Sequence, residues 1–165
     1  MRRLAFLVFI LSVCLLCRPP LRTANGDDSL PIDPADPKMT SEPKAPGAPA
    51  SYLYRQVDRI TARRASNERD YVRTKILNEE GRKYANVEIP YRKEDAGVSI
   101  SNIRARAIHP SGPIENFNGQ IFEQTIEKTK GVKTLAKTFT LPNVQVGSIV
   151  EYHWNFQGRA AYLRL

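Results

Sequence analysis

Residues 150–156, VEYHWNF, alternate strictly between apolar and polar side chains over the length of a whole strand. Val150, Tyr152, Trp154 and Phe156 fall on one face, and the polar residues between them fall on the other. Because successive side chains of a strand point to opposite faces, this pattern predicts a strand with one buried face. We expect the aromatic face to line a core, where each ring buries about 150–250 Å² of surface. A sugar-binding platform is the alternative.

Weaker alternation recurs through the rest of the chain after residue 50. The further predicted strands lie at 72–76, 103–107 and 135–141, with less distinct ones at 52–57 and 121–126. Turn residues separate them at 78–81, 109–113, 118–119, 130–131 and 142–147. Short strands divided by turns at roughly ten-residue spacing predict an all-β fold, an antiparallel β-sandwich. Only residues 79–84 are expected to form a short helical turn.

The composition changes before residue 51. Residues 27–50 carry six prolines at irregular spacing and few apolar side chains. Such a segment buries too little apolar surface to offset the entropy lost on ordering, so we predict a disordered Pro-rich linker. Its prolines favour an extended, semi-rigid spacer, and recognition as a Pro-rich ligand is the alternative.

The chain begins with a basic start, Met1-Arg-Arg, followed by the apolar run LAFLVFILSVCLLC at residues 4–17. As a helix this run would reach roughly 21 Å, less than the ~30 Å hydrocarbon core of a bilayer. This combination is typical of a secretory signal peptide, here residues 1–26 with cleavage before Asp27. We therefore predict an exported protein, periplasmic or associated with the cell envelope. If the signal is not cleaved, it would anchor the chain in the membrane.

The cysteines and histidines exclude several kinds of site. Cys14 and Cys17 are the only two cysteines, and both lie in the apolar run, so the folded region has neither a disulfide scaffold nor a cysteine metal site. His109 and His153 are the only histidines. We therefore expect no metal and no cofactor.

The charge balance indicates a kind of partner. The 165 residues hold 25 Lys and Arg against 17 Asp and Glu, a formal net charge of +8. Four arginines belong to residues 1–26 and the linker is acidic, so the remaining excess of positive charge lies in residues 51–165. Outside the cytoplasmic membrane a basic domain is expected to meet anionic envelope polymers or lipids and not nucleic acid. A merely solvated basic surface is the alternative.

Three blocks of sequence carry a family resemblance. They are YVRTKILNEEGRKYANVEIPY at 71–91, ISNIRARAIHPSGPI at 100–114 and KGVKTLAKTFTLPNVQVGSIVEYHW at 130–154. Over about residues 52–157 the chain resembles a bacterial domain of unknown function that lies directly N-terminal to a transglutaminase-like domain in exported proteins. The resemblance implies a β-sandwich, and it does not imply a known activity. It also implies that catalysis would belong to the downstream domain, with a cysteine nucleophile, a histidine base and an acidic orienter.

No catalytic residue can be carried over from the resemblance, because no cysteine follows Cys17 and the chain ends at Leu165. Residues 158–165 also differ from the family's continuation. We therefore predict a truncated, non-catalytic β-sandwich over residues 51–165 that would scaffold or present a downstream transglutaminase-like domain. Truncation would leave the strand 149–156 without its next partner, at the edge of a sheet.

Basic side chains are the remaining candidates for binding. Arg104 and Arg106 point to one side of their predicted strand, and Lys128, Lys130, Lys133 and Lys137 surround the turn at Gly131. If these strands are neighbours, the six form a basic strip. The strip gives the alternative function, an envelope module that holds anionic glycan or lipid headgroups. Charges that guard a sheet edge against aggregation are the other interpretation.

The two histidines have ordinary interpretations. His109 precedes Pro110 and is interpreted as a turn residue and not as a general base, because no Ser, Cys or carboxylate lies at motif spacing. His153 shares a strand face with Glu151, which predicts a surface ion pair of small energetic value.

Overall fold

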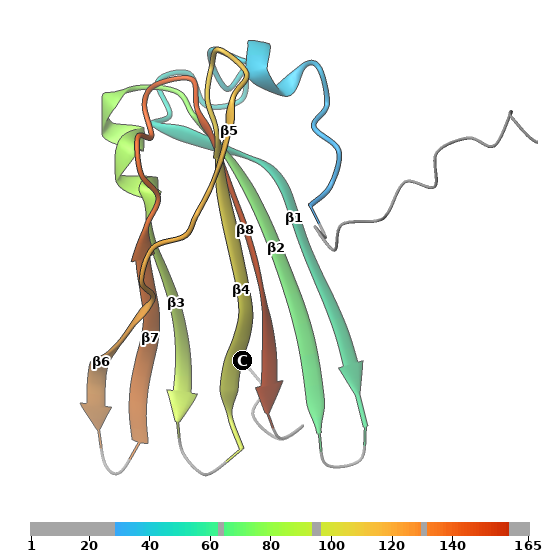
Figure 1. The fold of residues 1–165 in the computed structure, drawn as a ribbon, viewed down its shortest axis with the longest axis vertical. Coiled ribbons are helices and arrows are strands. Elements are labelled where there is room, and N and C mark those ends of the chain that lie inside the picture. The colour runs from blue at the N-terminus through green and yellow to red at the C-terminus, as the bar shows by residue number, and fades with distance from the viewer. Residues whose placement is uncertain (1–28, 63–64, 94–96, 130–131, 159–165) are drawn as a thin grey trace, which may run out of the picture. The chain divides into compact units, whose positions relative to one another are not determined.

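Two antiparallel sheets make up the architecture (Figure 1). The structure is a computed structural model that describes residues 29–62, 65–93, 97–129 and 132–158; the predicted signal peptide lies outside these residues. The larger sheet has the strand order β1 (Ala50–Thr61), β2 (Ser66–Ile76), β8 (Ile149–Gly158), β4 (Ser99–Ile108) and β5 (Ile114–Asn116). The smaller sheet has the order β3 (Asn86–Lys93), β7 (Val132–Thr140) and β6 (Phe122–Thr129). Two short 3₁₀ helices are η1 (Asp36–Lys38) and η2 (Glu79–Ala85).

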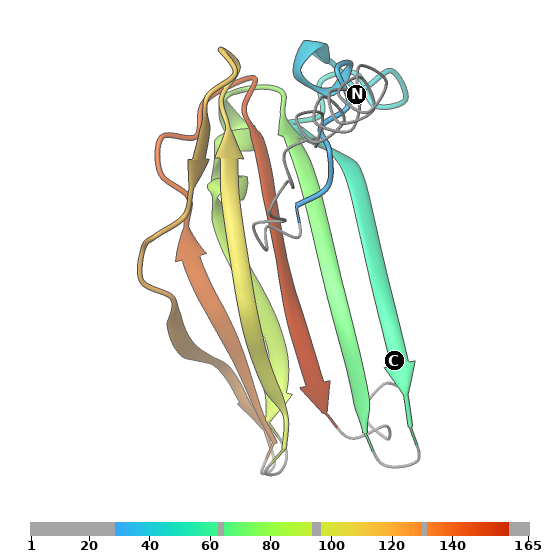
Figure 2. The same cartoon turned by 45° about the vertical axis from the view of Figure 1, so that its right-hand side comes forward.

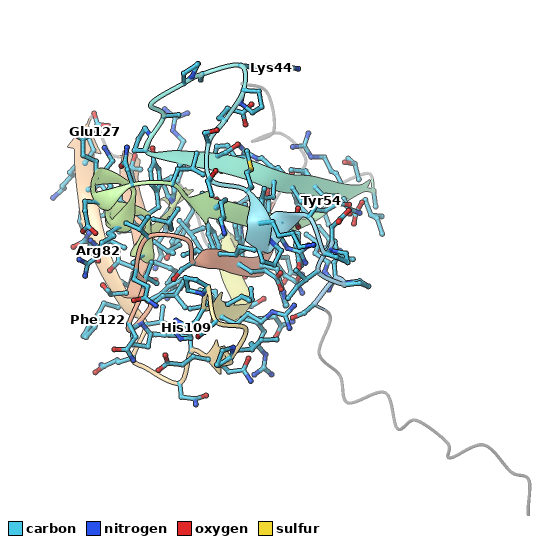
Figure 3. The ribbon with its side chains drawn as sticks, turned by 90° about the horizontal axis from the view of Figure 1, so that it is seen from above. Lys44, Tyr54, Arg82, His109, Phe122 and Glu127 are labelled. Carbon is cyan, nitrogen blue, oxygen red and sulfur yellow. The ribbon has the colours of Figure 1, made fainter. Side chains whose placement is uncertain are left out.

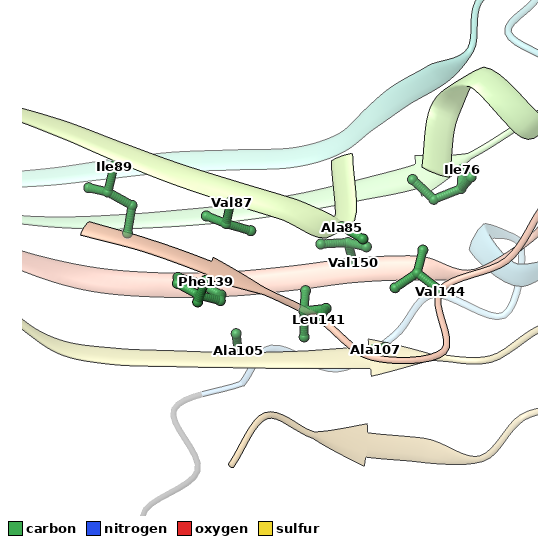
Figure 4. Packing of buried hydrophobic residues seen from close by; sticks show 10 residues of the cluster. All are labelled: Ile76, Ala85, Val87, Ile89, Ala105, Ala107, Phe139, Leu141, Val144 and Val150. Carbon is green, nitrogen blue, oxygen red and sulfur yellow. The ribbon is translucent and has the colours of Figure 1, made fainter. Parts of the chain in front are cut away.

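The predicted fold class is confirmed. The core comes from the inner faces of both sheets, which lie face to face in Figures 1 and 2. Figure 4 shows its ten buried members: Ile76, Ala85, Val87, Ile89, Ala105, Ala107, Phe139, Leu141, Val144 and Val150. Tyr152 and Trp154 pack against this cluster while staying partly exposed, and their rings stack with centroids 5.7 Å apart. Val150, Tyr152 and Trp154 of the aromatic face of β8 therefore do line the core, whereas Phe156 lies outside this cluster.

The strand β8 lies in the middle of its sheet, so the expectation that it forms an edge is wrong. It pairs with β2 on one side, from Ser66–Gly158 to Lys75–Ile149, and with β4 on the other. Figure 1 shows it between these two strands. The last described strand of the chain inserts between two earlier ones, and strand order in a sheet is independent of order in the sequence. The edges of the larger sheet are β1 and β5.

The alternation analysis missed β3. Val87, Ile89 and Tyr91 are buried while the residues between them are exposed, which is ordinary alternation. Pro90 interrupts this run and, lacking an N–H, argues against a central strand. It is accommodated because β3 is an edge strand that pairs only with β7.

The described part of the predicted linker contacts the larger sheet. From Ile32 onward it belongs to the same compact unit as the sheets. Pro49 O accepts hydrogen bonds from Leu77 N at 2.9 Å and Asn78 N at 3.4 Å, and Ser51 Oγ donates to Glu42 Oε2 at 2.6 Å. This arrangement differs from the extended spacer predicted for residues 27–50, because polar contacts with the sheet replace the apolar burial that the segment lacks.

Candidate functional site

A cluster of buried charges lies on the face of the larger sheet that points away from the core. We call Arg73, Glu151, Arg106 and Asp36 the outer charge cluster. Glu151 on β8 accepts hydrogen bonds from Arg73 on β2, at 2.8 Å from Nε and 2.7 Å from Nη2, and from Arg106 Nε on β4 at 2.7 Å. The strand register places each arginine directly opposite Glu151. Asp36 Oδ2 lies 3.6 Å from Arg73 Nη1.

Neighbouring groups hold Arg73 of the outer charge cluster in the charged form. The Tyr71 hydroxyl accepts from Arg73 Nη2 at 3.2 Å, and the Tyr71 ring stacks on His153 with centroids 6.0 Å apart. Burial acts to lower the pKa of Arg73, but Glu151 and Tyr71 outweigh it and raise the pKa above its usual value. The surface pair predicted between Glu151 and His153 is wrong, since both residues are buried and the arginines of neighbouring strands neutralise the carboxylate.

Lys75 ties the same face to two backbone segments. Its side chain is 1% exposed, and Nζ donates to Pro37 O at 2.9 Å and to Gly147 O at 2.5 Å. Burial lowers the pKa of Lys75, and Asp36 acts in the opposite direction. Together with Arg73, this lysine attaches the segment around η1 to β2. These contacts give Lys75 and Arg73 a structural role.

A buried carboxyl group lies on the inner face of β2. Asp70 is 5% exposed and stands opposite Trp154 in the strand register. Burial and then the neighbouring Glu68 raise its pKa to about 6, against the opposing effect of Arg55 and Arg59. Arg59 Nη2 lies 2.5 Å from Glu68 Oε2. The contacts of the described residues show no nucleophile beside Asp70 and Glu68, so the geometry gives these two carboxyl groups no catalytic role.

A cleft lies at the end of the sandwich that carries η2. Figure 1 shows η2, the turn between β4 and β5 and the loop before β8 at this end, and Figure 3 labels Arg82 and His109 there. The cleft encloses about 790 Å³ and is lined by η2, the junction with β3, the end of β7 with the loop after it, and His109. We call it the His109 cleft. Arg82 Nε donates to Val144 O at 3.2 Å and so joins η2 to that loop.

His109 and Asn143, which line this cleft, share a hydrogen-bond partner in Glu115. His109 Nε2 lies 3.1 Å from Glu115 Oε2, and Asn143 Nδ2 donates to the two oxygens of Glu115 at 3.3 and 3.2 Å. The turn placement predicted for His109 agrees with the hydrogen bond from its backbone N–H to Pro113 O at 2.9 Å. Asn143 has φ = 54°, a left-handed conformation that few residues other than glycine adopt.

The structure does not bring the predicted basic strip together. Arg104 and Arg106 lie on β4 in the larger sheet, whereas Lys128, Lys133 and Lys137 lie on β6 and β7 in the smaller one; Lys130 lies outside the described residues. The described strand β4 pairs with β5 and β8, so the strands are not neighbours as the strip required. Arg106 contacts Glu151, and Lys137 Nζ contacts Glu123 Oε2 at 2.7 Å.

Metal-binding clusters and membrane-spanning helices are both absent from the residues that the structure describes. Within that part of the chain, no group of three or more His, Cys, Asp or Glu side chains could hold a metal ion. Nor does any helix there have the length and apolar character needed to cross a membrane.

Comparison with known proteins gives a family. Residues 62–164 match a family described as a domain of unknown function with a solved structure, DUF3857. The chain belongs to the DUF3857 family. This identifies the resemblance seen over about residues 52–157, and it places β1 before the matched region of the DUF3857 domain. No curated protein matches the sequence.

A solved structure shares the fold of this DUF3857 domain. It is a crystal structure from Parabacteroides distasonis ATCC 8503, described as that of a putative protease. The match has a TM-score of 0.56 at 10% identity and covers 67% of this chain. The chain spans only 23% of the Parabacteroides protein. At this identity the likeness shows the fold and not the activity.

Sequence reasoning missed most residues of the His109 cleft and the outer charge cluster. The sequence pattern points to His109 as a turn residue, to Arg106 as part of a strip and to Glu151 as part of a surface ion pair. Glu115 follows His109 by six residues across a turn, which is a weak signal for a contact between them. Arg73, Glu151 and Arg106 occupied the polar positions of alternating strands, which the pattern assigns to solvent. Their mutual contacts depend on strand register, which the sequence pattern does not give.

Proposed function

We propose that this DUF3857 chain is the non-catalytic β-sandwich module of an exported protein and that it scaffolds or presents a transglutaminase-like domain. The observation that carries the proposal is the match to 23% of a longer protein described as a putative protease, together with the family match over residues 62–164. A module that accounts for so small a part of a longer protein fits the role of a support for another domain.

The chemistry of the chain supports a non-catalytic role. The sequence contains no cysteine after Cys17. His109, the histidine that lines the cleft, contacts Glu115, and the lining side chains offer no serine or cysteine nucleophile. The hydroxyl of the lining, Thr140 Oγ1, donates to Asn86 Oδ1 at 2.8 Å and not to His109. A histidine and a carboxylate without a nucleophile paired to them give no support for covalent acyl transfer.

The edge strand β1 offers a surface for a neighbouring domain. Tyr52 is 62% exposed and Ile60 is 74% exposed, and Val57 is also exposed. β1 pairs with β2 alone, so one edge of this strand is available for pairing or packing. Exposed apolar side chains on a long edge strand are a common basis of contact with another chain or domain.

The test measures catalytic activity and association with a transglutaminase-like domain separately. The purified chain should neither hydrolyse peptide amides nor transfer acyl groups to amines. Native protein captured with an antibody against residues 51–165 should carry a transglutaminase-like domain, either in the same polypeptide or as a bound partner, as identified by mass spectrometry. Captured protein without such a domain would overturn the scaffold role. Amide hydrolysis that is lost in His109→Ala with unchanged circular dichroism would make the chain an enzyme.

Export is tested on the same captured material. Peptide mapping should find an N-terminus near Asp27 in the envelope or periplasmic fraction. Recovery of the protein solely from the cytoplasm with an intact Met1 would contradict export.

A further inference from the structure

We propose that the His109 cleft binds a small ligand through an anionic oxygen group, a carboxylate or a phosphate. The inference is independent of any transglutaminase-like domain, because it depends only on side chains of this chain. It also differs from the basic strip, since the cleft lies at the end of the sandwich and contains none of the six residues of that strip.

The size and floor of the cleft fit a small molecule. Its volume of about 790 Å³ falls in the range of small-molecule sites, about 300–1,000 Å³. Leu141 and Val144 contribute apolar surface at its base and are themselves 2% and 5% exposed, so this part belongs to the rigid core. The cleft therefore combines a fixed apolar base with walls that carry polar groups.

The walls carry mostly hydrogen-bond donors. Arg82, Lys83, Asn86, Asn143 and Gln145 bring guanidinium, ammonium and amide groups, and Glu79 is the one carboxylate among the residues that line the cleft. Arg82 Nη1 contacts Glu79 Oε2 at 3.1 Å, but both side chains are more than half exposed. An ion pair so exposed contributes little free energy, so the Nη groups of the guanidinium can turn to a ligand at little cost. Arg82 and Lys83 outnumber Glu79 in the lining, and this excess of positive charge favours an anion over a cation.

Glu115 fixes two side chains of the cleft wall and is not itself among the residues that line the cleft. Its oxygens contact His109 Nε2 and accept from Asn143 Nδ2, so the carboxylate holds both side chains in place. The same contacts hold Asn143 in its left-handed conformation at φ = 54°.

The experiment is a titration of the full chain followed by ¹H–¹⁵N correlation spectra. The probes are inorganic phosphate and glucuronate, with glucose as the uncharged counterpart of glucuronate. We expect saturable shifts with a Kd in roughly the millimolar range or tighter, centred on Lys83, His109 and Asn143. Shifts with phosphate alone would assign the site to phosphorylated ligands, and shifts with glucuronate alone would assign it to carboxylates. Shifts with both would assign it to either group.

Variants separate the cleft from general basic charge. Lys83→Gln should raise the Kd of the bound probe about tenfold, which corresponds to the loss of one charge-assisted hydrogen bond. Arg82→Gln should do the same, and Lys83→Gln remains informative if loss of the Arg82–Val144 bond unfolds η2. Lys133→Gln, which removes an exposed charge on β7, should bind like the unmodified chain. The proposal is overturned if neither anion shifts these residues, if glucose binds as well as glucuronate, or if Lys133→Gln weakens binding as much as Lys83→Gln.

Discussion

Replacing Glu151 by glutamine keeps the shape of the side chain and removes the charge that holds the outer charge cluster together. Glu151 receives three charge-assisted hydrogen bonds, two from Arg73 and one from Arg106, at 2.7–2.8 Å. Its side chain is 2% exposed and that of Arg73 is 5% exposed, so water replaces little of what is lost. In the variant, the amide must also place an N–H group against one of the guanidinium donors.

The expected loss of stability is about 3–5 kcal/mol, the usual cost of removing one partner from a buried ion pair. Hydrogen bonds to charged groups are worth about 1.5–3 kcal/mol each, so three of them could account for more. We expect the loss of about 3–5 kcal/mol and not the larger sum of three hydrogen bonds. Glutamine keeps an acceptor oxygen, and Asp36 still lies 3.6 Å from Arg73. For a small domain stabilised by about 5–15 kcal/mol, this loss is a large fraction of the total.

The measurement is urea unfolding followed by the fluorescence of Trp154, the single tryptophan, which lies on the same strand. With a urea slope of about 1–3 kcal/mol/M, the midpoint should fall by roughly 2 M. The control is Glu88→Gln on the exposed face of β3, which should change stability by less than about 0.5 kcal/mol. A double-mutant cycle with Arg73→Met should give a coupling of at least about 2 kcal/mol. A loss below about 1 kcal/mol in Glu151→Gln, or simple additivity in the cycle, would refute this account of the cluster.

Two further variants test other parts of the sandwich. In the folded chain the pKa of Asp70 is raised from 3.8 to about 6, so the folded state binds more protons than the unfolded state in this window. The contribution of Asp70 to stability should therefore fall as the pH rises from about 4 to 6, by no more than about 3 kcal/mol. In urea unfolding, the difference in stability between the unmodified chain and Asp70→Asn should show this fall, whereas the difference from Asp58→Asn should not. A Cβ on Gly81 would lie 2.0 Å from Pro49 O, so Gly81→Ala should lose about 1–3 kcal/mol in the same assay. Unchanged stability in that variant would show that η2 does not pack against Pro49.

The inner faces of the sheets could be predicted from the sequence because burial on one face leaves a period of two. Val150 and Tyr152 on β8, and Ala105 and Ala107 on β4, are apolar at alternate positions and do face the core. The all-β class follows from several such runs. Strand prediction fails for β3, because Pro90 argues against a central strand. The structure accommodates this proline because β3 is an edge strand.

The outer charge cluster could not be predicted, because alternation records polarity and not exposure. Arg73, Arg106 and Glu151 occupy positions that the pattern assigns to water, yet all three are at most 12% exposed in their side chains. Their burial becomes intelligible only when β8 is known to lie between β2 and β4. That strand order brings one carboxylate between two arginines from segments far apart in the sequence. The same order explains why β8 is not an edge.

The His109 cleft was equally hidden in the sequence, because its walls come from three separate connections. Residues 79–86, 109–115 and 140–145 are turns and strand ends that meet only when both sheets are formed. Side chains of a cleft between connections can be substituted without disturbing the core. Binding residues therefore often lie on loops held by a rigid scaffold. In this chain the scaffold reaches the cleft directly, since Leu141 and Val144 belong both to the core and to the cleft floor. Ligand binding at Lys83 or His109 would therefore act on a rigid base, and it could alter the exposed walls of the module while leaving its sheets unchanged.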